Sequence, residues 1–235
     1  MTRLTYLLLT AQALSAEQPG DVRATISVQL RTLRAQPETA ARLGAEARLF
    51  HFLAEASPDE ASRARLHAEG LALAARALQI DPREPSALLW WAAHRGSQAR
   101  ILDPFSAMAI AREVESALLR LREIDPDHEH RAADRVLGHL YRVAPRGISI
   151  GSLEKARTHL RSAIEHAPDF PGNALFYAQF LAETGQCDEA RRWADGVGRS
   201  PELVRYPLER AGWIRDASRL LAGLSRRCPR EEAWP

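Results

Sequence analysis

The sequence has few cysteines, few lysines and few aromatic residues. It contains 2 cysteines in 235 residues, and Lys155 is its only lysine. Two cysteines are too few for a disulfide framework, and no cysteine–histidine group has the spacing of a zinc site. Aromatic residues make up 6% of the chain, and valine, isoleucine and threonine are sparse, which disfavours β-strands. These absences exclude a disulfide-rich scaffold and indicate an all-α protein.

Long apolar runs and strong charge imbalance are also absent. No segment reaches about 18 uninterrupted apolar residues, so no membrane-spanning helix is predicted. The net charge is +2, and no basic run alternates with aromatic residues, so we expect no nucleic-acid partner. The P-loop, the dinucleotide fingerprint and the nucleophile elbow are missing. We therefore assign no catalytic residue, no cofactor and no metal, and expect a non-enzymatic protein.

The N-terminal segment permits two interpretations. Residues 4–14 are apolar after Arg3, and Ala11-Gln12-Ala13 has the small-x-small form of a cleavage site, so residues 1–13 resemble a short export signal. The alternative is a first amphipathic helix that packs on the next one. Because the apolar run is brief and a single arginine precedes it, a cytoplasmic location is favoured, with export as the alternative.

Proline, glycine and capping residues divide the chain into about nine to eleven helices. Expected helix starts lie at Asp21, at Pro37, at Ser57-Pro58 and at Ser86. Further starts are expected at Asp103-Pro104 and Ser152, with other helices over about 131–143, 172–184, 188–197 and 208–225. We expect one helical-repeat domain over 1–235, with irregular helices over 1–57, core repeats over 58–201 and a capping helix and tail over 202–235.

Three helices end in a similar way, at Ala77–Pro82, Leu121–Pro126 and Ile164–Asp169. This internal repeat and the spacing of small and large apolar residues resemble the tetratricopeptide repeat. The residues that carry the resemblance in the best two units are Leu137, Gly138, Tyr141, Ala156, Leu160, Ala163, Pro168, Tyr177, Ala178, Leu181, Gly185, Ala190, Ala194, Val197 and Pro201. The resemblance implies a right-handed stack of antiparallel helical hairpins, an α-solenoid, whose usual role is binding.

Three further segments, within about residues 60–200, resemble the TatT-like proteins associated with TRAP-type solute transporters. They are 88–93 (LLWWAA), 135–141 (RVLGHLY) and 167–173 (APDFPGN). That resemblance implies action outside the cytoplasm, a solute-binding partner and an apolar ligand channel. The lipoprotein signal that is usual in that family is not found at the start of this sequence.

The first helix of each tetratricopeptide pair lines the concave face of the stack. On that face Arg135, His139 and Arg142 form a basic stripe at i, i+4 and i+7, and the next unit offers Gln179 and Glu183. Such a stripe can bind a carboxylate through two-pronged arginine contacts. The alternative is a solvated polar face whose arginines pair with glutamates.

Trp90 and Trp91 face about 100° apart on one helix, so one belongs to the core and the other lies at a boundary or in a pocket. Ligand stacking and packing within the protein are both open. The segment 145–151 places Ile148 and Ile150 in a polar loop, which folds back on the stack or covers an apolar site. His128-Glu129-His130 is interpreted as a helix start rather than a metal site.

Cys187 and Cys228 are expected at the same end of the stack, where a disulfide is possible if the protein is exported. The sequence leaves this open, as it does the oligomeric state.

The leading hypothesis is an adaptor whose concave groove holds a protein or peptide partner. The alternative is a TatT-like accessory protein that binds a small solute or a solute receptor. A continuous apolar tunnel would favour the solute, and a shallow polar groove would favour the peptide.

Overall fold

The computed structural model describes residues 19–228, and this part of the chain is all-α. Its helices are α2 (Pro19–Arg34), α3 (Ala40–Glu55), α4 (Glu60–Ile80), α5 (Pro85–Gln98), η2 (Ala99–Ile101), α6 (Pro104–Ile124), α7 (His128–Val143), α8 (Leu153–His166), α9 (Pro171–Glu183), α10 (Cys187–Val197), η3 (Pro201–Arg205) and α11 (Pro207–Arg227). None of these helices combines the length and the apolar character that crossing a membrane requires. The apolar segment 4–14, with its proposed cleavage site, lies outside the described residues.

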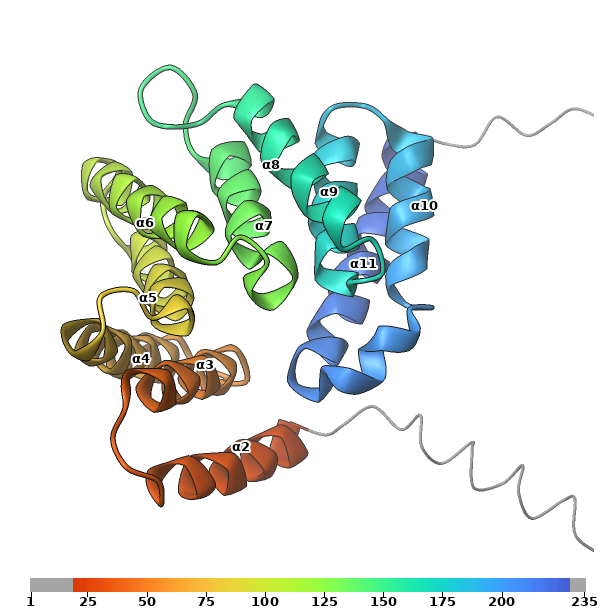
Figure 1. The fold of residues 1–235 in the computed structure, drawn as a ribbon. Helices are drawn as coiled ribbons and strands as arrows, with labels where there is room; N and C mark the ends of the chain where they lie inside the picture. The colour runs from red at the N-terminus through yellow and green to blue at the C-terminus, as the bar shows by residue number, and fades with distance from the viewer. Residues whose placement is uncertain (1–18, 229–235) are drawn as a thin grey trace, which may run out of the picture.

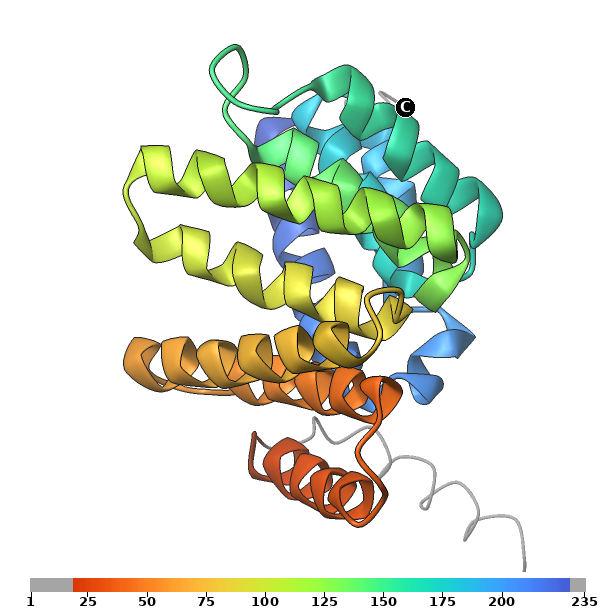
Figure 2. The same ribbon diagram turned by 60° about the vertical axis from the view of Figure 1, so that its left-hand side comes forward.

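The helices form successive hairpins that follow one another around an arc (Figure 1; Figure 2). The pairs are α3/α4, α5/α6, α7/α8 and α9/α10. The first helices of neighbouring pairs also contact each other, α3 with α5, α5 with α7 and α7 with α9, so these four helices form the inner layer. Helix α11 packs on α9 and α10 and continues this layer, and α2 packs on α3. The inner layer therefore carries the side chains that face the concave side.

Close approach of the hairpin helices depends on small residues, as the sequence predicted. A Cβ placed on Gly138 of α7 would come 2.4 Å from Cγ of Leu160 in α8, so only glycine fits there. Ala156 and Ala190 are fully buried at the corresponding contacts. The tetratricopeptide-type positions thus account for how α7 packs on α8 and α9 on α10.

Several predicted helix starts are confirmed and others are wrong. Asp103 caps α6 and Ser152 caps α8, each by accepting a hydrogen bond from a backbone N–H of the first turn. Ser57 does not cap α4, because its hydroxyl donates to the carbonyl of Leu53; Asp59 caps the helix by accepting from the N–H of Ser62.

Three other starts are displaced by a few residues. Thr39 rather than Pro37 begins α3, since its side chain accepts a hydrogen bond from the N–H of Arg42. Glu84 caps α5 before Pro85, so the helix begins one residue ahead of the predicted Ser86. Helix α2 begins at Pro19, two residues before the predicted cap Asp21.

The start of α7 contains a left-handed turn. Glu129, His130 and Arg131 have φ of 41°, 58° and 63°, a region that residues with a Cβ rarely occupy. The regular helix therefore begins after Arg131, close to its predicted start. Asn173 and Arg135 hold the turn: the Asn173 amide donates to the carbonyl of His130, and Arg135 donates to those of Glu129 and His130.

Cys187 and Cys228 are joined by a disulfide, with 6.4 Å between their Cα atoms. Cys187 is the first residue of α10, and Cys228 follows the last turn of α11. Arg191 lies beside the bond and donates to the carbonyl oxygens of Leu224 and Cys228. The two cysteines therefore lie at the same end of the stack, as their order along the helices predicted.

Candidate functional site

Two adjoining cavities open on the inner layer. The first, which we call the apolar cavity, has a volume of about 510 Å³. The second, the aromatic cavity, has a volume of about 450 Å³. His51, Ala93 and Val136 line both, so the two cavities share a wall that α3, α5 and α7 build.

Small and apolar side chains make up most of the apolar cavity. They come from α5, α6, α7 and the loop that follows α7, and include Ala92, Gly96, Met108, Ile110, Val114, Leu140, Val143 and Pro145. The small residues on α5 keep this helix from filling the space between α6 and α7. His139 is a polar member of the wall, and burial together with the charge of Arg142 lowers its pKa to about 4. At neutral pH the cavity wall therefore carries a neutral imidazole.

Aromatic rings enclose much of the aromatic cavity. They come from α3, α5, α9, α11 and the residues that precede α9 and α11: Phe52, Trp90, Phe170, Phe176, Tyr206 and Trp213. His130, from the left-handed turn, stacks on Phe170 with 4.5 Å between ring centroids. The turn thus places a backbone loop and an imidazole at the rim of the cavity.

Arg135 extends into the aromatic cavity instead of lying on an open face. Its guanidinium lies 4.8 Å from the centroid of the Phe170 ring and donates to Oδ1 of Asn173 at 2.9 Å. Within residues 19–228 its hydrogen bonds go to neutral oxygens rather than to carboxylates. Burial lowers the pKa of Arg135 to about 10, although the charges of Glu129 and Glu209, which line the same cavity, oppose part of this effect.

Trp90 lines the same cavity and carries a donor without an acceptor among the described residues. Its side chain is 8% exposed, and its indole Nε1 is buried without a hydrogen-bond partner in the described part of the chain. Trp91 faces another way: it packs against the core and lines neither cavity. Trp90 therefore belongs to the buried core and also lines the pocket, whereas Trp91 is partly buried.

The other two residues of the predicted basic stripe, His139 and Arg142, bond to each other and to side chains of the next unit. Arg142 donates to Oε2 of Glu183 at 3.0 Å, to Oε1 of Gln179 at 3.3 Å and to Nδ1 of His139 at 3.1 Å. The structure thus brings these four side chains together, and Arg142 has a glutamate partner, as the solvated-face interpretation requires. Only Arg135 keeps a charge without a carboxylate among the described residues of the stripe.

The loop after α7 was expected either to fold back on the stack or to cover an apolar site, and it does both. Ile150 packs against the core, whereas Ile148 is 71% exposed. Between them Ser149 lines the apolar cavity with its hydroxyl buried. The loop therefore folds back and closes one side of the apolar cavity.

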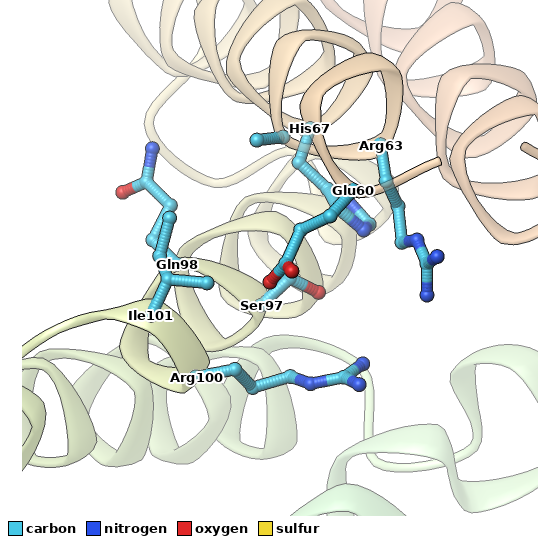
Figure 3. Close-up of a pocket in the computed structure, with 8 residues that line it drawn as sticks. Glu60, Arg63, His67, Ser97, Gln98, Arg100 and Ile101 are labelled. Atoms are coloured by element: carbon cyan, nitrogen blue, oxygen red, sulfur yellow. The ribbon is translucent and has the colours of Figure 1, made fainter. Parts of the chain in front are cut away.

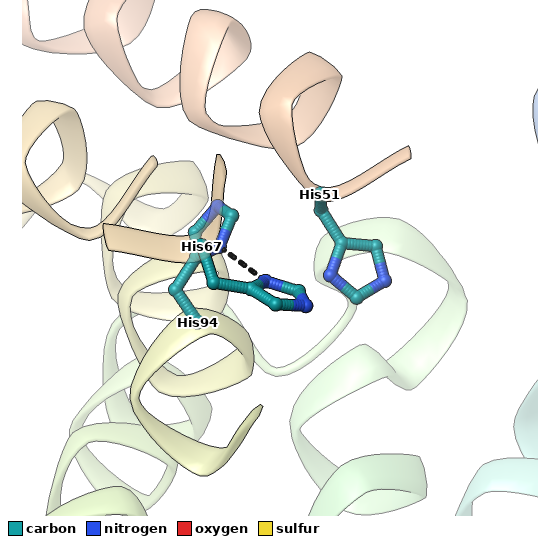
Figure 4. A group of neighbouring side chains, drawn as sticks. All are labelled: His51, His67 and His94. Atoms are coloured by element: carbon teal, nitrogen blue, oxygen red, sulfur yellow. Dashed lines mark hydrogen bonds between the residues drawn. The ribbon is translucent and has the colours of Figure 1, made fainter. Parts of the chain in front are cut away.

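Sequence reasoning missed a group of three histidines beside these cavities. His51 lies on α3, His67 on α4 and His94 on α5, and one ring nitrogen from each lies within 4.8 Å of the others (Figure 4). Burial lowers the pKa of His51 to about 4 and that of His94 to about 3. The residues are 16 and 27 positions apart, so no local motif signals the group.

Comparison with known proteins identifies the architecture. No family model and no curated protein matches the sequence. Among solved structures, a thermophilic TPR protein from Thermus thermophilus is similar, with a TM-score of 0.51 and 19% identity over 82% of this chain and 91% of that one. Stacks of this type generally act as binding surfaces rather than catalysts. The described part of the chain therefore has the fold of a tetratricopeptide-type helical repeat protein.

Proposed function

We propose that this protein is a binding protein whose inner cavities hold an apolar segment of a protein partner, with a carboxylate of that segment beside Arg135. The observation that carries the proposal is the partly buried guanidinium of Arg135 in an aromatic pocket, where its hydrogen bonds among the described residues go to neutral oxygens. A partly desolvated arginine is stabilised by an anion, and a ligand carboxylate would supply one. The Nε1–H of Trp90 offers that ligand a further donor.

The apolar cavity supports the same ligand chemistry. It adjoins the aromatic cavity across the shared wall and offers space for apolar side chains next to the site for the carboxylate. Helix-in-groove and extended-segment recognition both combine apolar anchors with a few placed polar groups. A partner that is charged throughout would leave this cavity unfilled.

Site-specific photocrosslinking in the native host tests the location of the partner. A photoreactive residue at Val143, which is 54% exposed and lines the apolar cavity, should capture the partner. Val28 of α2 is 53% exposed and lines none of the cavities described, so it is the matched control. Capture from Val28 but not from Val143 would contradict the proposal.

The captured segment then tests the role of Arg135. Arg135→Gln should weaken binding of a synthetic peptide of that segment by about 10-fold or more, because a buried charge-assisted contact is lost. Arg161→Gln is the control, since Arg161 is exposed and pairs with Glu165 on its own helix. Equal binding by wild type and Arg135→Gln would exclude the carboxylate contact.

A small apolar carboxylate is the second candidate ligand, and the volumes of the two cavities favour it. Cavities of about 300–1,000 Å³ are typical of small-molecule sites. A solute-binding role implies that the protein acts outside the cytoplasm. The disulfide supports that location, because such bonds persist in oxidising compartments. Native mass spectrometry of protein from its own host distinguishes the two, since a retained mass of a few hundred daltons indicates a solute.

A further inference from the structure

The three histidines form a donor group that packing alone does not explain. His67 is 4% exposed, His94 is fully buried, and their Nδ1 atoms face each other at 3.0 Å. Figure 4 shows the His51 ring beside this pair, approaching from α3. Three imidazoles from three helices therefore converge on one point between the first two hairpins.

The outer nitrogens of two of these rings have acceptors as neighbours. Nε2 of His94 lies 2.9 Å from the carbonyl oxygen of Ala47, so it must carry a proton. Nε2 of His67 faces a carboxylate oxygen of Glu55 at 3.7 Å. With Nε2 of His94 protonated in a neutral ring, its Nδ1 presents a lone pair toward Nδ1 of His67 at 3.0 Å, whereas Nε2 of His67 has no hydrogen-bond partner among the described residues.

A proton on Nδ1 of His67 or a metal ion can satisfy the Nδ1 lone pair of His94. A neutral His67 with its proton on Nδ1 makes one hydrogen bond to His94, but its own buried Nε2 then has no donor among the described residues. A metal ion satisfies both Nδ1 atoms with neutral rings. The Ala47 and Glu55 oxygens would then hold the outer N–H groups, as carbonyls and carboxylates do around metal-bound histidines.

The third ring favours the metal ion over the proton. Nδ1 of His51 is buried and has no hydrogen-bond partner among the described residues. A shared proton between His67 and His94 leaves this nitrogen without a role, whereas a metal ion uses it as a third ligand. Nitrogens around a tetrahedral zinc ion lie about 3.3 Å apart. The three ring nitrogens lie within 4.8 Å of one another, so metal binding would draw them closer together.

A small pocket adjoins the group at His67. This pocket, of about 120 Å³, is lined by His67 together with Glu60, Arg63, Ser97 and Arg100 among others (Figure 3). Ser97 and Arg100 also line the apolar cavity, as does His51. Space therefore borders the group on two sides, at His67 and at His51.

We propose that His51, His67 and His94 bind one divalent transition-metal ion of the zinc type. Imidazole nitrogens suit Zn²⁺, Cu²⁺ and Ni²⁺, whereas Mg²⁺ and Ca²⁺ require oxygen ligands that this group lacks. Three protein ligands leave the fourth tetrahedral position open, as in zinc sites that accept water or a ligand atom. The proposal does not depend on the partner or solute proposed above.

Cobalt titration of the untagged full-length protein tests the site. Co²⁺ replaces Zn²⁺ in tetrahedral sites and then absorbs visible light far more strongly than the hydrated ion does. Wild type should show this absorption with one Co²⁺ per chain, and Zn²⁺ should displace it. Absence of the absorption at millimolar Co²⁺ would overturn the proposal.

Substitutions locate the ligands. His51→Gln and His67→Gln should each weaken Co²⁺ binding by about 100-fold or more, and Glu55→Gln by about 10-fold, because it supports His67 indirectly. His139→Gln is the control, since His139 lines the apolar cavity but lies outside the group. Far-UV circular dichroism of each variant checks that the stack is folded. Equal affinities for wild type, His51→Gln and His67→Gln would also overturn the proposal.

The hydrogen-bond alternative gives a different result. If a proton joins the two Nδ1 atoms, wild type binds no Co²⁺, and ¹⁵N NMR finds that proton on Nδ1 of His67. In the metal-bound protein, Nδ1 of His67 carries no proton, and added Zn²⁺ raises the melting temperature of wild type but not that of His51→Gln.

Discussion

Gly70 of α4 lies against the imidazole of His94 in α5: a Cβ at position 70 would come 2.1 Å from Nε2 of that ring. The same Nε2 donates to the carbonyl of Ala47 in α3. One glycine therefore provides the space in which a buried histidine connects three helices. Alanine is the better helix former, so this glycine is present for packing rather than for helix stability.

Gly70→Ala should lower the free energy of unfolding by about 1–3 kcal/mol, because the methyl group displaces the His94 ring. Gly223→Ala is the matched control: Gly223 lies within α11, and a Cβ there meets nothing within 4 Å. That change should raise stability by about 0.5–1 kcal/mol. Urea unfolding followed by circular dichroism measures both, and equal effects of the two substitutions would contradict the packing argument.

Asn173→Ala should lower the free energy of unfolding by about 3 kcal/mol, because it removes three hydrogen bonds that the buried amide donates, each worth about 1 kcal/mol. The Asn173 side chain is 1% exposed, and its amide donates to the carbonyls of His130, Ala163 and Ala167. Gln179→Ala, on the same helix, is the control. It removes an acceptor for one hydrogen bond from Arg142 and should cost less than about 1 kcal/mol. Urea unfolding of the two variants compares these costs, and a smaller loss for Asn173→Ala would contradict the role of the amide.

Reducing the disulfide should destabilise the protein by up to about 4 kcal/mol, since it closes a loop with a sequence separation of 41 residues. Urea unfolding with and without a reductant measures the difference. The variant in which Cys187 and Cys228 are both serine should match the reduced wild type and should not respond to the reductant. A reductant effect on that variant would show that another process is being measured.

Stability should fall as the pH drops from about 6.5 to about 4, in part because of His139. Burial and Arg142 lower the pKa of His139 from 6.5 to about 4, so in this range the unfolded chain binds a proton that the folded protein does not. His139→Gln should therefore reduce the slope of unfolding free energy against pH, by up to roughly 1.4 kcal/mol per pH unit. Unchanged slopes in urea titrations would contradict the lowered pKa.

The sequence predicts those features that depend on local spacing. Asp103-Pro104 marks a helix start whatever lies around it, and Arg135, His139 and Arg142 share a helix face through their i, i+4 and i+7 spacing. Ser57 shows the limit of this reasoning. Its hydroxyl bonds to the preceding helix at Leu53, and Arg23 of α2 donates to its oxygen, so tertiary contacts override the capping signal.

Features that depend on the arrangement of several helices escaped prediction. The left-handed turn at residues 129–131 contains no glycine, and Asn173, more than 40 positions away, helps to hold it. The position of Arg135 in the aromatic cavity likewise depends on its contacts with Phe170 and Asn173. His51, His67 and His94 converge only after α3, α4 and α5 have packed, so no spacing rule reveals them.

The bond between Cys187 and Cys228 also affects how the stack comes apart. In a helical repeat protein each hairpin contacts mainly its neighbours, so unfolding proceeds by fraying from an end. The disulfide secures α11 to the start of α10, whereas α2 packs only on the single helix α3 among its major contacts. Fraying should therefore begin at α2, so that amide hydrogens exchange first in α2 and last toward the C-terminal hairpin. After a reductant cleaves the disulfide, the C-terminal end should fray as well.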